Sequence, residues 1–490
     1  MDTDEKKNLS LIVSEKNESR QVSKIGEFGP LALNLHKSKI RFLILIFCCL
    51  TIMGYYFVYD DPAPLYKELV KPASDKGMGL NHYQYNLLFS FYSIPNFILP
   101  FIGGILIDKY LGKRISVILF AGLITFGQFV FSLASNIVKY NVIGAQFLLL
   151  GGRFILGLGG ENLSVVQFAF LFSWFKGREL AMASGFFFSI GCIGTVLCDN
   201  FEPYLYYLSG GSFVLPFWFG FVVCVLSLIT WIVEAVLDYR ANKPIIEKKR
   251  ARENDDIKTE VNLKDLRRFG KPYWLLVLIC VAINVSLFTY QNVASALYQE
   301  RFQIKVQVAA FLLSVPYLMC SLLNPLLGYF LDKIGMKTFF LGLASFLILM
   351  GHIIMAIIPQ IEEGSQPSYR CVLGIILYGF GYCLYSINLW GYFPYCVDES
   401  LIGSAYGIAF SLENIGLGLG PILIAFIYTH TNNYKHGFFG VNLVCAVEAL
   451  IALIGSIILF IYDYNHTQVL FSSTFQNKKK KRLSFIDIDA

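Results

Sequence analysis

The chain is divided by a series of long apolar segments, and this pattern constrains its fold more than any other feature. About 20 mostly apolar residues are needed for one helix to cross the hydrocarbon core of a bilayer. The segments of that length are 40–58, 85–107, 115–134, 142–172, 180–201, 212–237, 273–294, 308–331, 338–358, 372–392, 403–428 and 437–461. The sequence therefore predicts an all-α membrane protein with twelve transmembrane helices.

The composition supports a membrane environment and excludes several other classes of protein. Of the 490 residues, 56% are hydrophobic and only 15% are charged, whereas soluble domains carry about 25% charged residues. The net charge of +6 does not indicate nucleic-acid binding, because the basic residues lie in the connections between apolar segments. The eleven cysteines show no metal-ligand spacing, so neither a metal nor a cofactor is predicted. Without a nucleophile elbow or a nucleotide-binding loop, the chain is not predicted to be an enzyme.

A charged region divides the twelve segments into two sets of six. Lysine and arginine gather in the connections on one side of the predicted membrane, which favours a cytosolic location for both termini. A short amphipathic helix is predicted around 261–269, within the charged region. The predicted organisation is a cytosolic N-terminal tail at 1–38, an N-terminal six-helix bundle at 39–238, a charged cytosolic linker at 239–271, a C-terminal six-helix bundle at 272–462 and a basic cytosolic tail at 463–490.

A short charged motif recurs at matched positions of the two halves. Asp108 and Lys109 close the second apolar segment, with Arg114 shortly after them, and Asp332 and Lys333 close the eighth. An internal repeat is typical of transporters built from two related halves. Because opposite charges at a helix end can hold one conformation and separate in another, we predict that these residues act in gating. An ordinary solvated helix end is the alternative interpretation.

Two charged residues inside the fourth apolar segment are candidates for substrate binding. Arg153 and Glu161 are eight residues apart, about two helical turns, so they can face one cavity. Charges within a membrane span are costly unless they pair or line a wet cavity. We expect Glu161 to recognise an amino or cationic group of a substrate. Arg153 is interpreted as its counterion or, alternatively, as part of a structural ion pair.

Polar residues within spans of the second half provide further candidates. Tyr290 and Asn388 are candidate substrate ligands, although hydrogen bonding between helices is the commoner role of such residues in membranes. Glu413 is the stronger candidate, because a carboxylate is the costliest of these groups to bury.

Several segments carry a resemblance to a known family. The repeated charged motif resembles motif A of the major facilitator superfamily. The segments YFVYDDPAPL, QYNLLFSFYSIPN, GRFILGLGGENLSVVQ, SWFKGREL and LIGSAYGIAFSLENIGLG are similar to the family of major facilitator superfamily domain-containing protein 1, whose members are lysosomal dipeptide transporters. This resemblance covers roughly residues 41–462. It implies two six-helix bundles that move dipeptides by alternating access, with a substrate site near the bilayer midplane.

The resemblance also implies roles for two residues. The glutamate that holds the peptide amino group in the family matches Glu161, and the arginine that holds the peptide carboxylate matches Cys192. A neutral thiol cannot replace a guanidinium group in binding a carboxylate. Another amino-bearing or cationic solute therefore remains an alternative substrate, and a non-transporting membrane scaffold or receptor is a second alternative. Whether transport is proton-coupled or a simple uniport is left open.

A location and a partner are implied by the resemblance as well. Family members are associated with the lysosomal membrane, and a heavily glycosylated single-span membrane protein is known as their companion.

Overall fold

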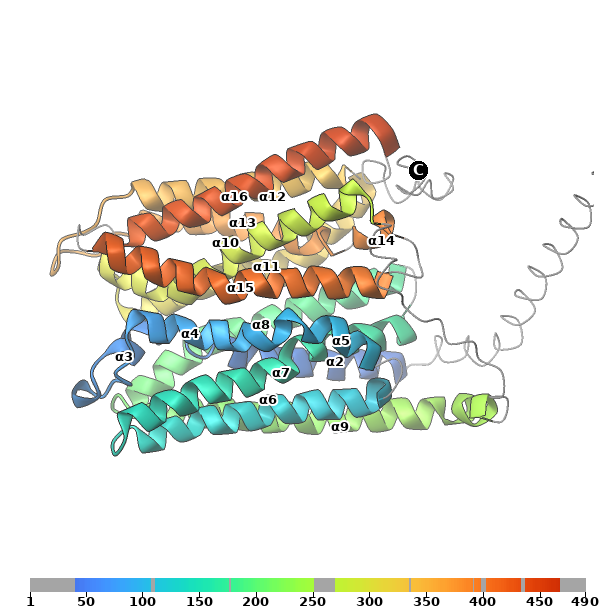
Figure 1. Cartoon of the computed structure of the whole chain (residues 1–490), viewed down its shortest axis with the longest axis horizontal. Coiled ribbons are helices and arrows are strands. Elements are labelled where there is room, and N and C mark those ends of the chain that lie inside the picture. Colours follow the sequence, from blue (N-terminus) through green and yellow to red (C-terminus); the bar gives the residue numbers. More distant parts are fainter. Residues whose placement is uncertain are drawn as a thin grey trace, which may run out of the picture.

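The computed structural model describes residues 40–106, 111–175, 178–250, 269–334, 336–390, 392–397, 402–432 and 437–467. These residues form helices and connections and contain no strand. Ten of the described helices are long and apolar enough to cross a membrane. A further long helix, α8 (Arg178–Leu208), and a broken helix formed by α4 (His82–Ser93) and α5 (Leu99–Leu106) complete the twelve predicted spans (Figure 1).

The first six spans form the N-terminal bundle. Besides α4, α5 and α8, its spans are α2 (Ile40–Asp60), α6 (Gly112–Ile137), α7 (Val142–Trp174) and α9 (Val214–Arg250). The connection between α2 and α4 contains a short helix, α3 (Tyr66–Val70), and a 3-10 turn at Ala73–Asp75. Asparagine side chains begin two of the spans, because they accept hydrogen bonds from backbone N–H groups that the first helical turn leaves free. Asn81 caps α4 in this way, and Asn141 caps α7.

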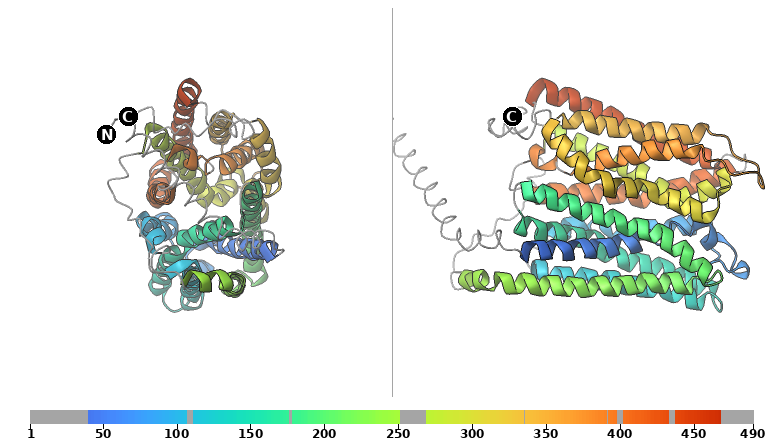
Figure 2. Two further views of the ribbon diagram at one scale, coloured as in Figure 1. Left: turned by 90° about the vertical axis from the view of Figure 1, so that its right-hand side faces the viewer. Right: turned by 180° about the vertical axis from the view of Figure 1, so that it is seen from behind.

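The second six spans form the C-terminal bundle. They are α10 (Lys271–Phe302), α11 (Val306–Ile334), α12 (Lys337–Ile357), α13 (Cys371–Asn388), α15 (Ile402–Asn432) and α16 (Gly437–Tyr462). The short helix α14 (Phe393–Cys396) follows α13, and a final turn at Asp463–Thr467 follows α16. The separation into two bundles is clear when the molecule is seen from behind or along the spans (Figure 2).

The second span differs from the continuous helix expected over 85–107. Helix α4 ends at Ser93, a 3-10 turn covers Ile94–Phe97, and α5 begins at Leu99. Pro95 lies at the start of the turn, where the missing N–H group and the fixed ring interrupt the α-helical hydrogen bonds. The span is therefore two helices in line.

The predicted boundary between the N-terminal bundle and the linker also differs. Helix α9 continues to Arg250, well into the region 239–271 that was expected to be a linker. Residues 251–268, which include most of the predicted amphipathic helix, lie outside the described part of the chain. The predicted tail at 1–38 and residues 468–490 also lie outside it.

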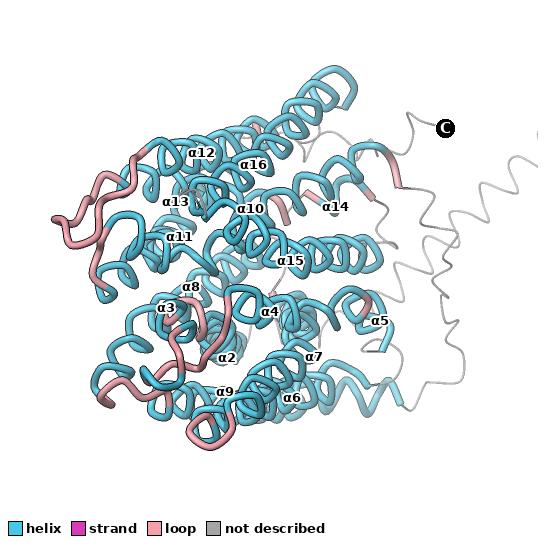
Figure 3. The backbone as a smooth tube through the Cα atoms, turned by 60° about the vertical axis from the view of Figure 1, so that its left-hand side comes forward, coloured by secondary structure: helices cyan, strands magenta, loops and turns pink. Residues whose placement is uncertain are grey.

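The two bundles meet along two pairs of spans. Helix α8 packs against α11, and α15 packs against α4, the following turn and α5. The second contact is close because Gly418 of α15 has no side chain: a Cβ atom there would lie 2.6 Å from the ring of Phe97. Small residues allow this kind of close helix packing in membranes. The tube view shows α15 and α4 side by side at the centre of the molecule (Figure 3).

One end of the molecule carries α3 and is called the α3 end. Helix α2 begins and α16 ends at the opposite end, which is called the termini end (Figure 1). Contacts between the bundles close the α3 end. The Tyr85 hydroxyl donates to the Asn292 carbonyl oxygen over 2.6 Å, and the Ser295 hydroxyl donates to the Pro64 carbonyl oxygen over 3.2 Å. The rings of His82 and Tyr428 are 4.5 Å apart, which joins α4 to α15.

Large apolar side chains cover the outside of both bundles. Ile143, Leu226, Leu322 and Leu419 are more than half exposed. Outward apolar side chains are unfavourable in water and favourable against lipid. Their distribution over both halves is that of a multi-pass membrane protein.

Candidate functional site

Helix α7 presents Glu161 towards the first two spans of its own bundle. The Tyr92 hydroxyl on α4 donates to a Glu161 carboxylate oxygen over 3.2 Å, and the Tyr55 hydroxyl on α2 is hydrogen bonded to that of Tyr92. The neighbouring Gly160 makes room for this pair, because a Cβ atom there would lie 2.3 Å from the Tyr92 hydroxyl oxygen. Glu161 itself is only partly buried.

A second carboxylate comes from the opposite bundle. Glu413 on α15 is 7% exposed, and the Cys280 thiol lies 3.9 Å from one of its oxygens. Asn284 and Tyr385 contact the same thiol. Glu413 and Glu161 lie close enough to interact electrostatically, although one belongs to each half. Two acidic groups from the two bundles therefore face a common region.

Cys192 lies where α8 meets the C-terminal bundle. Its buried side chain packs with Tyr317, Cys320 and Cys383, which come from α11 and α13. The sulfur atoms of Cys320 and Cys383 are 3.3 Å apart. Glycine allows α8 to approach the first span here, because a Cβ atom at Gly194 would lie 2.1 Å from the Met53 carbonyl oxygen.

Sequence reasoning did not identify Tyr56, which joins these groups. It lies on α2, and its phenol interacts electrostatically with Cys192, Glu161 and Glu413. A Cβ atom at Gly191 would lie 3.2 Å from its ring. The four residues Tyr56, Glu161, Cys192 and Glu413 are called the central site below. Tyr56 lies in an aromatic-rich segment, and no local pattern distinguishes it from its tyrosine and phenylalanine neighbours.

Arg153 is part of the framework of the N-terminal bundle. It is fully buried, and its guanidinium group donates to the carbonyl oxygens of Val58, Tyr59 and Leu88 over 3.0, 2.8 and 3.4 Å. Its charge also lies over the rings of three aromatic residues, among them Phe89 at 5.3 Å. These contacts tie α7 to α2 and α4 and leave little of the guanidinium group for a substrate.

Tyr290 and Asn388 lie away from the central site. The Tyr290 hydroxyl lies 3.1 Å from the Tyr298 hydroxyl and 2.8 Å from the Met355 sulfur, inside the C-terminal bundle. The Asn388 side chain donates to the Leu384 carbonyl oxygen and accepts from the Tyr392 hydroxyl. Both residues make the hydrogen bonds within and between helices that the sequence left as the alternative interpretation.

In the first copy of the repeated charged motif, the described residues form a charged cluster around Asp238. Arg114 donates to an Asp238 carboxylate oxygen over 2.6 Å, Lys113 lies 3.3 Å from the other oxygen, and the Trp174 indole donates to that same oxygen over 2.9 Å. These contacts join the start of α6 and the end of α7 to α9 near the termini end.

Four of the predicted gating residues cannot be placed in this cluster. Asp108 and Lys109 lie outside the described residues, and Asp332 and Lys333 lie on α11 with side chains outside the described part.

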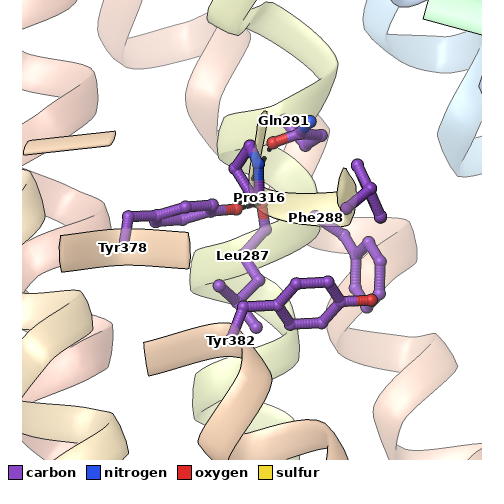
Figure 4. Close-up of a pocket in the computed structure, with 7 residues that line it drawn as sticks. Leu287, Phe288, Gln291, Pro316, Tyr378 and Tyr382 are labelled. Carbon is purple, nitrogen blue, oxygen red and sulfur yellow. Dashed lines mark hydrogen bonds between the residues drawn. The ribbon is translucent and has the colours of Figure 1, made fainter. Parts of the chain in front are cut away.

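A small pocket lies beside the central site, between α10, α11 and α13 (Figure 4). It is too narrow to admit a water molecule. Tyr317 and Tyr382 line it and also pack against the cysteine cluster around Cys192. The Tyr378 hydroxyl donates to the Leu287 carbonyl oxygen over 2.9 Å at its edge. The side of the central site that the C-terminal bundle forms is therefore mainly aromatic.

Comparisons with known proteins agree with this architecture. The Major Facilitator Superfamily model matches residues 42–421. The lysosomal dipeptide transporter MFSD1 of Homo sapiens is 32% identical over 395 residues, which cover 79% of this chain and 80% of that protein. The Bos taurus protein is 31% identical over 437 residues, covering 87% and 86% of the two chains.

Solved structures with the same fold are transporters. A POT family transporter in complex with a thioalcohol-conjugated peptide has a TM-score of 0.67 at 12% identity, covering 86% of this chain and 96% of that one. The peptide transporter POT in complex with sulfate has a TM-score of 0.64 at 15% identity, covering 88% and 96%. At these identities the likeness shows the fold alone. Twelve spans in two bundles, the superfamily match and the MFSD1 relatives lead to one assignment: the chain belongs to the Major Facilitator Superfamily and, within it, to the family of the lysosomal dipeptide transporter MFSD1.

Proposed function

We propose that this protein is a secondary transporter that moves small amino-bearing solutes, dipeptides first among them, across a membrane by alternating access. The observation that carries the proposal is the position of Glu161. It is a partly exposed carboxylate within the fourth span, and it interacts with Glu413 of the other bundle. A charged carboxylate at this depth of the membrane costs free energy unless it binds a ligand or lines a water-filled cavity. The relatives named dipeptide transporters support peptides as the substrate class.

In this proposal Glu161 binds the substrate amino group. Its partner Tyr92 donates a single hydrogen bond, which leaves acceptor positions for an ammonium group. Glu161→Gln removes the negative charge with little change in shape. We expect normal folding and a loss of uptake of about tenfold or more, the size of losing a charge-assisted hydrogen bond of roughly 1.5–3 kcal/mol.

Reconstituted proteoliposomes provide the measurement. Glu448→Gln is the matched control, because it neutralises a carboxylate of α16 that is not part of the central site. Wild-type uptake of every accepted substrate by the Glu161 variant would refute the role of this residue.

A cationic solute is the second candidate substrate, and the electrostatics of the site favour it. Among the described residues, no basic group interacts with the carboxylate of Glu161 or of Glu413. The guanidinium group of Arg153 donates its hydrogen bonds to backbone carbonyl oxygens, and Cys192 carries no cationic group. A site with two acids and no available cation suits polyamines, or dipeptides with a basic side chain, better than a free carboxylate.

A parallel screen of dipeptides, C-terminally amidated dipeptides, amino acids and polyamines separates these substrates. Uptake of the amides and polyamines alone selects the second candidate. The same ligands should raise the unfolding temperature in detergent if they bind. A scaffold or receptor with this fold would transport none of them.

The orientation and location are part of the proposal. The basic residues of the connections at the termini end, which include Lys113 and Arg114, support a cytosolic position for that end, because loops rich in lysine and arginine usually remain in the cytosol. The α3 end then faces the lumen of a lysosome-like compartment, the location named for the relatives. The Arg114–Asp238 ion pair holds the start of α6 against α9 as the bundle rocks.

A further inference from the structure

Four acidic side chains lie buried together between the central site and the α3 end. Asp60 is the last residue of α2 and Asp61 follows it, whereas Asp199 and Glu202 lie on α8. Their exposed fractions are 4%, 0%, 1% and 0%. Asp199 interacts with Asp60, and Glu202 interacts with Asp61. The four residues therefore form two pairs across the α2–α8 contact, and they are called the acid pairs below.

One face of α8 connects the acid pairs to the central site. Positions 192, 195, 199 and 202 are spaced by three or four residues, so they follow one helix face. Cys192 of the central site begins this face, and the Thr195 hydroxyl donates to an Asp60 oxygen over 2.7 Å. On α2, Tyr56 of the central site precedes Asp60 by one turn and interacts with it. The acid pairs are thus displaced from the central site by about 6 Å along α2 and about 10 Å along α8, at a rise of about 1.5 Å per residue.

The acid pairs lack hydrogen-bond donors. Both oxygens of Glu202, one oxygen of Asp199 and one oxygen of Asp61 are buried without a hydrogen-bond partner among the described residues. The Gln128 amide on α6 donates to the other Asp61 oxygen over 2.7 Å, but its own carbonyl oxygen is also buried without a partner in this part of the structure. All of these atoms are acceptors. Because buried polar atoms normally have partners, the arrangement points to a ligand that supplies donors.

The packing of α9 keeps two of these side chains in place. A Cβ atom at Gly220 of α9 would lie 2.8 Å from the Gln128 amide nitrogen and 3.3 Å from an Asp61 oxygen. Contacts of this length would displace both side chains, so the absence of a side chain at position 220 allows Gln128 and Asp61 to lie side by side against α9.

The charges around the acid pairs do not balance them. Arg153 is the one cation of the described residues that interacts with Asp60 and Asp61, and its guanidinium group already donates to carbonyl oxygens. The other titratable groups that interact with the four acids are thiols and phenols of the surrounding helices: Tyr56, Tyr59, Tyr85, Cys198, Cys224, Tyr298 and Tyr317. The missing positive charge must therefore come from a bound cation.

We infer that the acid pairs are a second cation subsite of the transport pathway, so that the substrate is an organic dication. Glu161 binds one cationic group, and the acid pairs bind the other. An ammonium group brings three donors and one positive charge, and the buried acceptors lack both. The inference rests on the proposed transport function and specifies its substrate class.

The separation of the two subsites limits the shape of this substrate. A displacement of about 6–10 Å suits the four-carbon stem that carries the ammonium group of a lysine side chain. A dipeptide with a lysine side chain and a linear diamine both have this chemistry. Cys192 lies between the subsites and carries no positive charge. A cation at that position would repel the substrate and attract the acid pairs itself.

The test measures counterflow of matched probes by the full chain in proteoliposomes. Counterflow is an exchange that needs no ion gradient, so its result does not depend on how transport is driven. Lysyl-alanine amide and norleucyl-alanine amide are similar in length and differ in the second ammonium group. We expect wild type to have a half-saturation concentration at least about tenfold lower for the lysyl probe, the size of one charge-assisted hydrogen bond.

Neutral variants of the acid pairs should remove this preference. Asp199→Asn and Glu202→Gln keep the shape of the side chains and remove one negative charge each. We expect the ratio of the two half-saturation concentrations to fall towards one in both variants. A preference for the lysyl probe that persists in both variants would overturn the inference, because the second ammonium group would then bind elsewhere.

A matched control is available in the same bundle. Glu234 is also a fully buried carboxylate, but it accepts hydrogen bonds from Cys48 and Gln167 and lies outside the acid pairs. Glu234→Gln should keep the wild-type preference for the lysyl probe. Loss of the preference in this control as well would show that the effect is not specific to the acid pairs, and would contradict the inference.

A second variant covers the case in which the neutral variants do not fold. Thr195→Lys adds an ammonium group to the same face of α8, four residues before Asp199, where side chains of a helix meet. It supplies the missing positive charge, so we expect an unfolding temperature at or above that of wild type. Because the added ammonium group occupies the subsite, the preference for the lysyl probe should be lost. A retained preference would contradict the inference.

The remaining outcomes separate the inference from the proposed function. Equal half-saturation concentrations of the two probes in wild type refute the second subsite and leave the transporter in place. Absence of counterflow with every probe counts against transport itself, and the inference falls with it. Exchange of 1,4-diaminobutane but not of butylamine would support a diamine as the dication, whereas exchange of the lysyl probe alone would support a dipeptide.

Discussion

At the scale of single residues, the two charged side chains of the fourth span have different roles because their neighbours differ. Glu161 is partly exposed and accepts a hydrogen bond from Tyr92, whereas Arg153 is fully buried and donates to three carbonyl oxygens. A guanidinium group can satisfy several carbonyl oxygens at once because its donors form a rigid fork. Arg153 therefore has a structural role, in which its hydrogen bonds link α7 to α2 and α4.

Replacing this arginine with lysine tests that assignment. Arg153→Lys keeps the charge but cannot reach all three carbonyl oxygens, so we expect a loss of stability of about 1–3 kcal/mol from unsatisfied buried groups. Thermal unfolding of the purified protein in detergent measures the change. A variant that unfolds at the wild-type temperature but no longer transports would instead make Arg153 a substrate ligand.

At the scale of elements, glycines determine how closely the spans of a bundle approach. A Cβ atom at Gly157 of α7 would lie 2.1 Å from the Tyr92 carbonyl oxygen on α4, whereas a Cβ atom at Gly151 of the same helix would meet nothing within 4 Å. Backbone atoms cannot move aside as a side chain can. The α7–α4 contact, which also positions Glu161 beside Tyr92, therefore requires a glycine at 157.

Two alanine substitutions on α7 separate packing from helix propensity. Gly157→Ala should force α4 away and destabilise the protein by about 1–3 kcal/mol, with lower transport because Tyr92 moves. Gly151→Ala should be neutral or stabilise the protein slightly, since alanine favours helices by about 1 kcal/mol over glycine. Unfolding temperatures of both variants provide the comparison. Equal temperatures would show that the close approach at 157 is not required.

At the scale of the whole molecule, the closed α3 end contains groups that respond to pH. His82 lies before the second predicted span, and its Nδ1 atom is 2.5 Å from the Tyr66 hydroxyl. Burial lowers the pKa of His82 from its ordinary value of 6.5. Its ring packs on Tyr428, whose hydroxyl donates to Glu300 over 2.9 Å. The closed arrangement therefore disfavours the protonated imidazole.

The sign of this shift predicts how acid affects the α3 end. A histidine whose pKa is lowered by closure releases its proton on closing, so closure is favoured at neutral pH and weakened as the pH falls below 6.5. We expect a cysteine introduced at Ser295, which contacts the other bundle, to be labelled faster at acid pH. Normalisation to a cysteine at the exposed Glu363 removes the intrinsic pH dependence of labelling. His82→Gln should abolish the remaining effect, and pH dependence that persists in that variant would exclude His82 as its source.

The number and order of the spans, their division into six and six, and the candidate role of Glu161 follow from the sequence alone. Hydropathy identifies each span separately, because the backbone N–H and C=O groups of every span must be hydrogen bonded within that helix when it lies in the bilayer. Hydropathy does not reveal the break at Pro95, because this break depends on backbone hydrogen bonds. It does not reveal the extension of α9 to Arg250 either, because the added residues follow the apolar segment.

Only the tertiary structure decided which polar groups meet. Glu161 and Glu413 are far apart in the sequence and approach each other across the two bundles, and Asp199 reaches Asp60 only because α8 packs on α2. Sequence spacing places residues on a face of their own helix, but it contains no information on which helix that face contacts. The interaction of two buried charges depends on their separation and on the dielectric around them, and both are properties of the packed bundles.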